Sequence, residues 1–433
     1  MAKIEPKILK GFRDFLPENE IPRQKMIETI KTSFETFGFE PLETPALEYA
    51  ETLIGKYGDE GDKLMYRFKD NGERDVALRY DLTIPLARVV AQNGDMKRPW
   101  KRYQISPVWR ADNPQKGRYR EFYQCDADIV GSTSPLADAE ILAVAATTLR
   151  KLNVSNFVIR VNSRSIISTF YDSLELSEEQ KIKAIRAVDK TDKIGKKGVA
   201  EELAAAGISS QKSESIMAFS DTSIDALSGQ SELSGVAEAF PAIKDSLASL
   251  ISIIESAAAL VSDTKFIIDF SIARGLDYYT GMIFETVLTD LPNFGSVLSG
   301  GRYDNLIGMF SNKPVPAVGG SIGLDRLFAA LEELKLIKKE KSVAKALIIN
   351  FDESLQGDYL ELASNLRDAG VNTILYFETA DLKKQLSYAS DKGIRYALIY
   401  GSNEAKEGKI VIKDLEKGSQ KEVLWKDAAA ALA

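Results

Sequence analysis

The chain has 433 residues, which is too long for one compact core and predicts two to four domains. Hydrophobic residues make up 44% and charged residues 27% of it, as in ordinary soluble globular proteins. The sequence contains no run of about 18 apolar residues that would span a membrane, and its first residues lack the apolar core of a secretory signal, so we expect a cytoplasmic protein. A net charge of −7 argues against wholesale binding of nucleic acid but leaves room for a local basic surface.

Two residue types are nearly absent, and this excludes several kinds of chemistry. The chain has no histidine and a single cysteine, Cys125. Catalysis by Ser-His-Asp or Cys-His groups, histidine metal sites and intrachain disulfides are therefore excluded, and a cysteine-based zinc site is not expected. An enzyme of this composition has to work with carboxylates, arginine, lysine, tyrosine, backbone groups and bound ions.

The first hundred residues begin extended, with a turn at Leu16-Pro17, and continue into an amphipathic helix that ends at Gly38. Four apolar residues at helical spacing predict this helix: Met26, Ile30, Phe34 and Phe37. The other elements expected here are an edge strand at 39–49, which holds two prolines, a hairpin at 64–82 and a helix at 82–92.

In the middle of the chain, two strands at 102–110 and 121–130 flank the polar loop ADNPQKGRYR. Residues 174–260 are rich in Ser, Ala, Glu and Lys and show helical periodicity with almost no strand pattern, so we interpret about 174–235 as a helical insertion. The other expected elements are a helix at 135–151, a strand at 157–162, a helix near 240–260, strands within 265–325, the helix LDRLFAALEELKLI and a lysine-rich linker near 335–345.

The last 90 residues form a separate unit. Three short apolar runs alternate with helical segments at 356–369 and 381–392, each followed by a glycine, Gly370 or Gly393, that is typical of a helix C-terminus. A hairpin closes the chain. This β-α-β-α-β-β order predicts a small α/β domain with a largely parallel sheet.

The polar loop is the densest group of residues that could carry chemistry. Arg110 and Asp112 end one strand, and Lys116, Arg118 and Arg120 precede the next. Guanidinium groups fork onto phosphate oxygens, so this hairpin could hold a polyphosphate. A solvated basic turn is an equally good interpretation of the loop by itself.

Two further segments suggest a pocket. The segment Arg274–Gly281 places an arginine before glycine and two tyrosines, which suggests a pocket wall, although a β-bulge with a salt-bridged arginine is favoured without context. The glycines of Gly300–Asp304 and of Gly319–Leu327 allow another group to approach the backbone closely, or allow simple close packing. Neither segment fits the G-x-G-x-x-G pattern, and dinucleotide binding is rejected.

Carboxylates also occur in strand-like positions. Asp81 and Thr83 face the same way on an extended segment and could hold a substrate ammonium group, or could cap the helix that follows. Gln124 and Asp128 share one strand face with Asp126 between them, so this face has to meet water or a polar cavity. Cys125 points the opposite way, as a core residue would.

Together and in this order, these segments resemble class II aminoacyl-tRNA synthetases, and most closely the histidyl-tRNA synthetase family. FGFEPLETPALEY resembles motif 1, RYQISPVWRADNPQKGRYREFYQCDADIVG motif 2 and AVGGSIGLDRL motif 3, while ARGLDYYTGMIFE is similar to the histidine-specific segment. The resemblance implies an α+β fold: an antiparallel sheet with flanking helices over 1–335, interrupted by the helical insertion, and a C-terminal α/β anticodon-binding domain over 345–433. It also implies a homodimer built through the motif 1 region.

The resemblance implies ligation of L-histidine to tRNA(His) with ATP and Mg²⁺, through a histidyl-adenylate. Arg110 and Arg274 are then expected at the α-phosphate as the catalytic pair. For ATP the resemblance adds Asp112, Arg118, which is similar to an arginine facing the γ-phosphate, and Arg326 of motif 3. For histidine it implies Asp81, Leu82, Thr83 and Gln124 around the amino group, Asp128 and Tyr279 at the imidazole ring, and Tyr278 beside them.

Other proteins share parts of this pattern. The regulatory subunit of ATP phosphoribosyltransferase resembles the catalytic domain, but it normally lacks the anticodon domain and need not keep the three arginines. A class II enzyme for another amino acid is disfavoured by RGLDYY. For tRNA phosphates, plausible contacts are Lys97, Arg98, Lys101, Arg102, Lys383 and Lys384.

Overall fold

The computed structural model describes residues 4–55, 58–272, 278–311 and 313–432. By their contacts the residues form two compact units, one of Met1–Arg13 with Met26–Leu336 and one of Asp14–Lys25 with Ile337–Ala433. Within the part of the chain that the structure describes, no helix is both long enough and apolar enough to cross a lipid bilayer.

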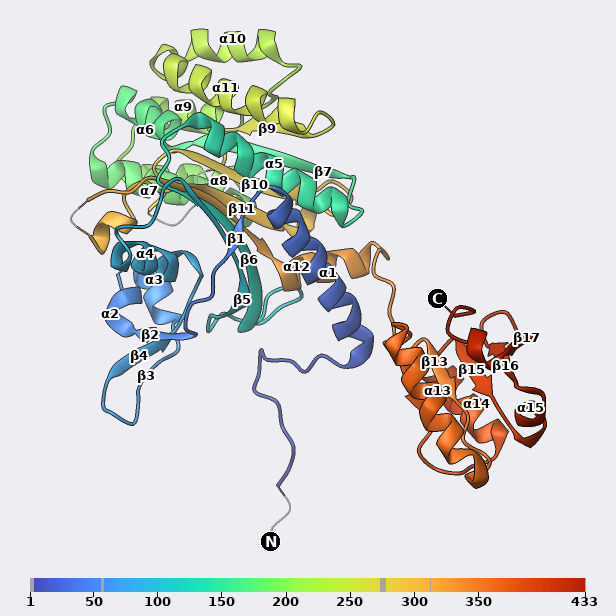
Figure 1. Cartoon of the computed structure of the whole chain (residues 1–433). Helices are drawn as coiled ribbons and strands as arrows, with labels where there is room; N and C mark the ends of the chain where they lie inside the picture. The colour runs from blue at the N-terminus through green and yellow to red at the C-terminus, as the bar shows by residue number, and fades with distance from the viewer. Residues whose placement is uncertain (1–3, 56–57, 273–277, 312, 433) are drawn as a thin grey trace. The chain divides into compact units, whose positions relative to one another are not determined.

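A nine-stranded sheet forms the centre of the larger unit (Figure 1). Its neighbouring strands are antiparallel except for the pairs β1–β5 and β7–β9, which are parallel. In spatial order the strands are β1 (Glu40–Pro41), β5 (Trp100–Trp109), β6 (Glu121–Val130), β12 (Ala317–Gly323), β11 (Leu298–Arg302), β10 (Met282–Leu288), β7 (Phe157–Ser163), β9 (Lys265–Asp269) and β8 (Ser223–Asp225). The predicted antiparallel sheet is thereby confirmed.

The two faces of strand β6 have different partners, because successive side chains of a strand point to opposite sides. Ala127 lies beside Phe34 and Ile141 on the side covered by helices, and Cys125 is fully buried. Gln124, Asp126 and Asp128 point to the other side and line a cavity. The polar pattern of this strand therefore selects which face of the sheet carries the site.

Some helices pack against the large sheet, and the insertion helices lie near its β7–β9 end. Helices α5 and α12 contact strands β6 and β12, and Ser33 of α1 shares a hydrogen bond of 2.8 Å with Thr148 of α5. Figure 1 shows the insertion helices, in green and yellow, gathered near β7 and β9. The helices whose residues belong wholly or partly to this unit are α1 (Pro17–Thr36), α2 (Ala50–Leu53), α3 (Gly58–Lys63), α4 (Thr83–Gln92), α5 (Pro135–Lys151), α6 (Arg164–Ser173), α7 (Glu178–Asp189), α8 (Thr191–Ala205), α9 (Ser210–Ser220), α10 (Gln230–Ala239), α11 (Lys244–Leu260) and α12 (Leu324–Glu333).

A small antiparallel sheet of three strands precedes α4. It consists, in spatial order, of β2 (Leu47–Tyr49), β4 (Asp75–Leu78) and β3 (Arg67–Lys69). Strands β3 and β4 form the predicted hairpin. The single edge strand predicted at 39–49 is wrong, because the segment supplies β1 to the large sheet and β2 to this one. Pro41 is the last residue of β1 and Pro45 lies before β2, and neither can donate a backbone hydrogen bond.

The smaller unit is an α/β domain with a five-stranded sheet in the order β14–β13–β15–β16–β17. The prediction of a largely parallel sheet holds for only half of the pairings, because β15–β16 and β16–β17 are antiparallel. The elements are β13 (Ala346–Ile348), α13 (Gln356–Asp368), β14 (Thr373–Leu375), α14 (Leu382–Asp391), β15 (Tyr396–Ile399), α15 (Ser402–Glu407), β16 (Lys409–Asp414) and β17 (Ser419–Leu424).

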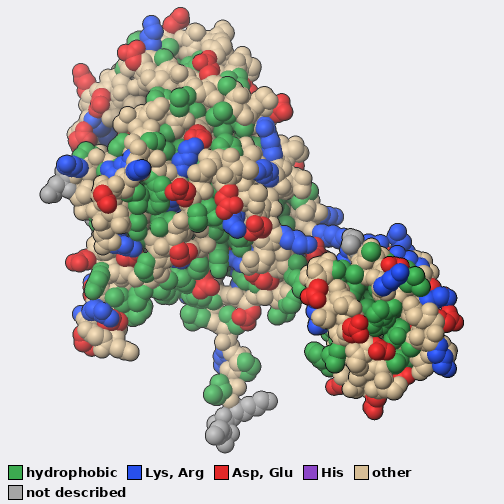
Figure 2. Space-filling view, in the orientation of Figure 1, with side chains coloured by type: hydrophobic (Ala, Val, Ile, Leu, Met, Phe, Trp, Pro, Cys, Tyr) green, Lys and Arg blue, Asp and Glu red, His purple; other side chains and the backbone are tan. Residues whose placement is uncertain are grey.

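Charged side chains of both signs are interspersed over the visible face of each unit (Figure 2). This distribution agrees with the moderate net charge of −7. On this face, a basic surface for nucleic acid would be local.

Candidate active site

A cavity of about 740 Å³ opens on the face of the sheet toward which the polar side of β6 points. It brings together residues that lie far apart in sequence and that were singled out for their chemistry. Those that line it are Asp81, Thr83, Arg110, Asp112, Arg118, Gln124, Asp128, Tyr278, Tyr279 and Arg326. Two predicted residues are not among them: Arg274 lies outside the described residues, and the side chain of Leu82 is fully buried in the core, so Leu82 has only its backbone to offer a ligand.

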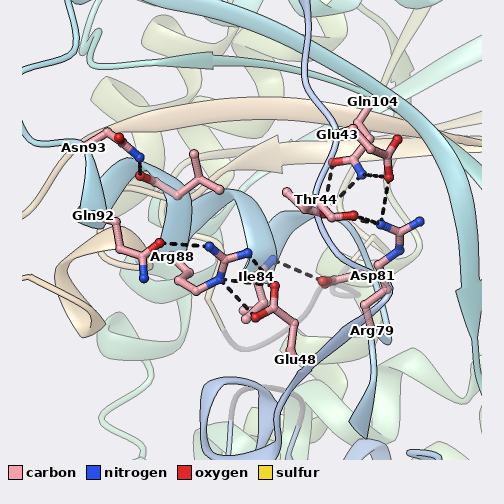
Figure 3. A network of polar contacts seen from close by, with 11 residues as sticks. Glu43, Thr44, Glu48, Arg79, Asp81, Ile84, Arg88, Gln92, Asn93 and Gln104 are labelled. Carbon is pink, nitrogen blue, oxygen red and sulfur yellow. Dashed lines mark hydrogen bonds and ion pairs between the residues drawn. The ribbon is translucent and has the colours of Figure 1, made fainter. Parts of the chain in front are cut away.

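A polar network holds the segment around Asp81 in place (Figure 3). The buried Arg79 donates from Nη1 to the carbonyl of Thr44 at 2.5 Å and to Glu43 Oε1 at 3.1 Å. Asp81 Oδ1 accepts a hydrogen bond of 3.0 Å from the backbone N–H of Ile84, in the first turn of α4. The carboxylate therefore caps the helix, as one interpretation of the sequence had it, and also lines the cavity.

Arg110 stands in the cavity wall with its guanidinium group between two aromatic rings. Its central carbon lies 4.4 Å from the ring centre of Tyr80 and 5.1 Å from that of Phe122. Nε donates to the carbonyl of Tyr80 at 3.0 Å, and Nη2 approaches Gln124 Oε1 at 3.5 Å. Stacking and the backbone contact fix the orientation of the cation before any ligand arrives.

Two further arginines line the cavity, one from the loop between β5 and β6 and one from α12. Arg118 is exposed, beside a tight turn in which Gly117 has φ +72°, and Asp112 is half-buried. Arg326, at the start of α12, donates to the carbonyl of Ser296 at 3.0 Å. The cavity therefore offers several guanidinium groups within one wall, which suits a polyphosphate.

The N-terminal segment contacts this loop and helix α12. Arg13 forms an ion pair of 2.6 Å with Asp325, and its guanidinium carbon lies 3.1 Å from the ring centre of Tyr119. Asp325 also accepts a hydrogen bond of 2.7 Å from the backbone N–H of Tyr123, at the start of β6. The segment therefore links the loop to α12.

Further along β6, the cavity becomes acidic. Asp128 lies four residues beyond Gln124, or about 13 Å along a strand. One carboxylate oxygen of Asp128 accepts from the hydroxyl of Tyr303, and the other lies 2.7 Å from Nη2 of Arg102, which is fully buried. A Cβ added at Gly319 would lie 1.8 Å from Asp128 Oδ1, so only glycine allows the carboxylate to reach this position.

Burial shifts the acid–base behaviour of this acidic end. Desolvation, only partly offset by Arg102, raises the pKa of Asp126 to about 7, and the charge of Asp128 adds to the increase. Desolvation likewise raises the pKa of Asp128, against the opposing effects of Arg102 and the Tyr303 hydroxyl. The pKa of Tyr279 is raised by burial and by the nearby aspartates, so its hydroxyl stays protonated.

Sequence reasoning missed two residues here and misplaced a third. Tyr303 and Asp126 had no assigned role, although the segment GGRYD and the shared face of β6 pointed to both. Arg102 was taken for a contact to tRNA phosphate, which is wrong because its side chain is 0% exposed. A single arginine between apolar and polar strand residues gives no sequence sign of which face it occupies.

A cationic wall and an acidic end in one cavity would suit two substrates at once: a polyanion and a small molecule with an ammonium group. Comparison with known proteins shows which family the chain belongs to. A family model described as histidyl-tRNA synthetase matches residues 11–327, and an anticodon binding domain matches 345–433. The chain belongs to the histidyl-tRNA synthetase family.

Curated relatives match over nearly their full length. A histidine–tRNA ligase of Rhodopirellula baltica is 43% identical over 98% of this chain and 96% of its own, and one of Wolinella succinogenes is 40% identical over 100% and 98%. The predicted family and activity, ATP-dependent ligation of histidine to its tRNA, are confirmed.

Solved structures show the same fold. The crystal structure of histidyl-tRNA synthetase from Nostoc sp. PCC 7120 superposes with a TM-score of 0.89 at 35% identity, covering 99% of both chains. A Bacillus halodurans structure titled ATP phosphoribosyltransferase regulatory subunit/histidyl-tRNA synthetase reaches 0.75 at 21% identity, over 89% of this chain and 97% of its own, which shows a shared fold alone. The anticodon binding domain and the ligase relatives favour the synthetase over the regulatory alternative.

Proposed function

We propose that the cavity is where L-histidine and ATP react to form histidyl-adenylate, before transfer to tRNA(His). The observation that carries this proposal is that the ten predicted residues named above line one cavity, with guanidinium groups near Gln124 and carboxylates further along β6. Arg110 and Arg326, with the exposed Arg118, would bind ATP, with Asp112 near it. Asp81, Thr83 and Gln124 would surround the amino group of histidine, with the Leu82 backbone beside them.

The imidazole ring would lie at the acidic end. Asp128 and Tyr279 are the residues assigned to it, and Tyr278 supports them, because its ring centre lies 5.0 Å from that of Tyr279 and 5.8 Å from that of Tyr303. An amino acid without ring nitrogens would leave these buried polar groups unpaired. Such a loss is worth about 10⁴–10⁵ in discrimination, which makes a separate editing site unnecessary.

Adenylate formation would need no protein base. The histidine carboxylate, already ionised, attacks the α-phosphorus, a new O–P bond forms, and the bond to the β-phosphate oxygen breaks to release pyrophosphate. Arg110 and Arg274 would stabilise the charge that develops at the α-phosphate. In the second step a ribose hydroxyl of the tRNA attacks the adenylate carbonyl, and its proton passes to the departing phosphate of AMP.

Mg²⁺ would enter as part of the ATP substrate and offset charge on the departing pyrophosphate. Among the described residues, no group of three or more acidic or cysteine side chains is placed to hold a metal ion by itself.

We also propose a cytoplasmic homodimer. Exposed apolar side chains support an interface in the motif 1 region: Leu47 and Tyr49 of β2 are 39% and 53% exposed, and Phe68 of β3 is 48% exposed. Burying such side chains against a second copy would stabilise the assembly. Sedimentation at micromolar concentration tests this, and a species of 47.8 kDa alone would exclude the dimer.

Histidine-dependent exchange of pyrophosphate into ATP tests the proposed site. Arg110→Ala should reduce exchange at least about 10²-fold, because it removes one preorganised donor. Arg110→Lys should recover only part of the activity, because lysine restores the charge without the paired N–H donors of the guanidinium group. Arg67→Ala, in an exposed ion pair of the β3–β4 hairpin, is the matched control and should leave exchange unchanged. Wild-type exchange in Arg110→Ala, or exchange that does not depend on histidine, would contradict the proposal.

A further inference from the structure

The acidic end of the cavity contains a carboxylate oxygen that the proposed histidine contacts leave unexplained. Asp126 is 2% exposed and lines the cavity, and its Oδ1 has no hydrogen-bond partner among the described residues. Buried polar atoms are nearly always paired, and one left unpaired costs on the order of 1–3 kcal/mol. An unpaired oxygen in a substrate cavity therefore points to a ligand group.

Asp128, the residue first assigned to the ring, already has protein partners on both oxygens. Tyr303 donates its hydroxyl to one, and the guanidinium group of Arg102 lies 2.7 Å from the other. The Arg102 side chain is anchored as well, since Nη2 also donates to the carbonyl of Leu82 at 3.3 Å. Asp128 is therefore fixed as an ionised acceptor, whereas Asp126 is the carboxyl group with a free oxygen.

The strand pairing places the two carboxyl groups in order. Asp126 and Asp128 are two residues apart on one face of β6, about 6.6 Å along the strand. Asp126 is paired in register with Ser321 of β12 on one side and Gln104 of β5 on the other. The side-chain amide of Gln104 donates to Glu43, Thr44 and Ser106. It is therefore directed away from Asp126.

We propose that Asp126 is a specificity-determining residue of the histidine site and forms a hydrogen bond to the imidazole ring of the substrate. This inference rests on the proposed function of the cavity. A neutral imidazole has one N–H donor and one bare nitrogen acceptor. The ionised Asp128 accepts from the N–H group, and a protonated Asp126 donates to the bare nitrogen. The pair of aspartates then offers one acceptor and one donor, which match the two ring nitrogens, and Tyr279 lines the cavity beside the ring.

The charges around Asp126 support this division of roles. The titratable and charged groups that face it are Arg102 of β5, Asp128 of β6, Asp81 before α4 and Tyr279 before β10, and Tyr303 after β11 faces Asp128. Arg102 offsets one carboxylate, and the substrate ammonium group offsets Asp81. A third ionised carboxylate would have no counter-charge, so the bound state keeps Asp126 protonated.

This arrangement predicts proton uptake on binding. Burial raises the pKa of Asp126 to about 7, and the imidazole ring of free histidine titrates at about 6.5. At pH 8 both are deprotonated, so forming the complex takes up close to one proton, and the affinity for histidine falls by up to about tenfold per pH unit above 7. Near pH 5.5 both are protonated, and binding instead releases a proton.

Calorimetric titration of the full chain with histidine, in two buffers of different ionisation enthalpy, counts these protons. Asp126→Asn mimics the protonated acid, so uptake at pH 8 should drop to near zero and the Kd should become constant between pH 7 and 8, while staying within about threefold of wild type at pH 6.8. Asp126→Ala removes the ring contact and should weaken histidine at least about tenfold at pH 6.8. The matched control is Asp138→Asn, another buried aspartate whose pKa is raised by desolvation but which does not line the cavity, and it should keep the wild-type proton uptake.

The substrate supplies a second control. A histidine analogue with a triazole ring, which stays neutral over this range, should show the same uptake with the wild-type protein, since the proton goes to Asp126. The substrate amino group titrates alike in all variants and cancels in their comparison. No uptake by the wild-type protein at pH 8, or equal uptake by Asp126→Asn, would overturn the inference even if histidine-dependent exchange is normal. Exchange that ignores histidine would instead overturn the proposed function itself.

Discussion

Gly319→Ala is the substitution whose effect on the histidine site can be worked out most directly from the structure. Gly319 of β12 is paired in register with Asp128 of β6. An added Cβ would lie 1.8 Å from Asp128 Oδ1 and 2.9 Å from the carbonyl oxygen of Ala127, whereas real Cβ contacts are essentially never under 3.0 Å. The carboxylate would therefore have to retreat by about 1.2 Å, the difference between 3.0 and 1.8 Å, because the backbone is held on both sides by sheet neighbours.

A displacement of this size separates Asp128 from the Tyr303 hydroxyl and from Arg102, since both contacts are at hydrogen-bonding distance. The displaced carboxylate would also lose its proposed hydrogen bond to the substrate ring. A hydrogen bond to a charged group contributes about 1.5–3 kcal/mol, and 1.4 kcal/mol corresponds to a factor of ten in affinity. We therefore expect the KM for histidine in pyrophosphate exchange to rise between about 10- and 100-fold. Overpacking should also reduce stability by about 1–3 kcal/mol.

The KM for ATP separates a local effect from a general one, because the ATP contacts lie at the other end of the cavity and should change less than about threefold. Gly308→Ala is the matched control: its Cβ would meet Pro314 at 3.5 Å, an ordinary van der Waals distance, and both KM values should stay at the wild-type level. A wild-type KM for histidine in Gly319→Ala would refute the packing argument. Equal increases in both KM values would show that the sheet, rather than the Asp128 position, was disturbed.

Two further predictions concern the second arginine expected at the α-phosphate and the lysines expected to contact tRNA. Arg274→Ala should lower adenylate formation at least about 10²-fold, since it removes one of two guanidinium groups at the α-phosphate, and normal formation would refute that role. The double variant Lys383→Glu with Lys384→Glu, on the exposed surface of α14, should raise the KM for tRNA and reduce the salt dependence of aminoacylation by about 0.7–0.9 per lost phosphate contact, with pyrophosphate exchange unchanged. An exposed lysine of the same unit, Lys417, gives the control variant Lys417→Glu, and an equal effect there would argue against a site on α14.

Local patterns predicted the elements whose neighbours are close in sequence. The helix expected at 135–151 is α5 with the same bounds, and the strands expected on either side of the polar loop are β5 and β6. Strong periodicity and a short connection determine these elements, whatever the rest of the chain does. The position of Pro17 was seen as a turn, although it is the first residue of α1, where proline's missing N–H costs nothing.

The errors fall where pairing depends on a distant partner. Strand β8 is three residues long and exists because it pairs with β9, so the insertion, predicted to be mostly helical, contains one short strand that no local pattern showed. Helix α15 has six residues, too few for a periodic pattern to be visible. The C-terminal sheet was expected to be largely parallel because strands and helices alternate. The closing hairpin β16–β17 was predicted, but the antiparallel pairing of β15 with β16 was not.

In the candidate site, too, the side chains that share one strand were predictable, and their partners from distant strands were not. The period of two along β6 placed Gln124, Asp126 and Asp128 on one face, and the structure has them there. The partners of Asp128 could not be found in this way. Tyr303 lies 175 residues away in sequence, and its approach requires the order β6–β12–β11 together with a glycine at the crossing point.

The buried charges of this site show why its residues conflict with the rules that predict a core. Asp81, Asp126 and Asp128 are each no more than 3% exposed, and the guanidinium group that faces them from within the protein belongs to Arg102. Burying an ion without a counter-charge costs more than any local packing returns, so an isolated domain would gain stability from apolar residues at these positions. The missing positive charge, the ring donor for Asp128 and the ring acceptor for Asp126 are groups that histidine carries. The carboxylates are therefore complementary to the complex rather than to the free protein, and a rule based on folding alone assigns them to the surface.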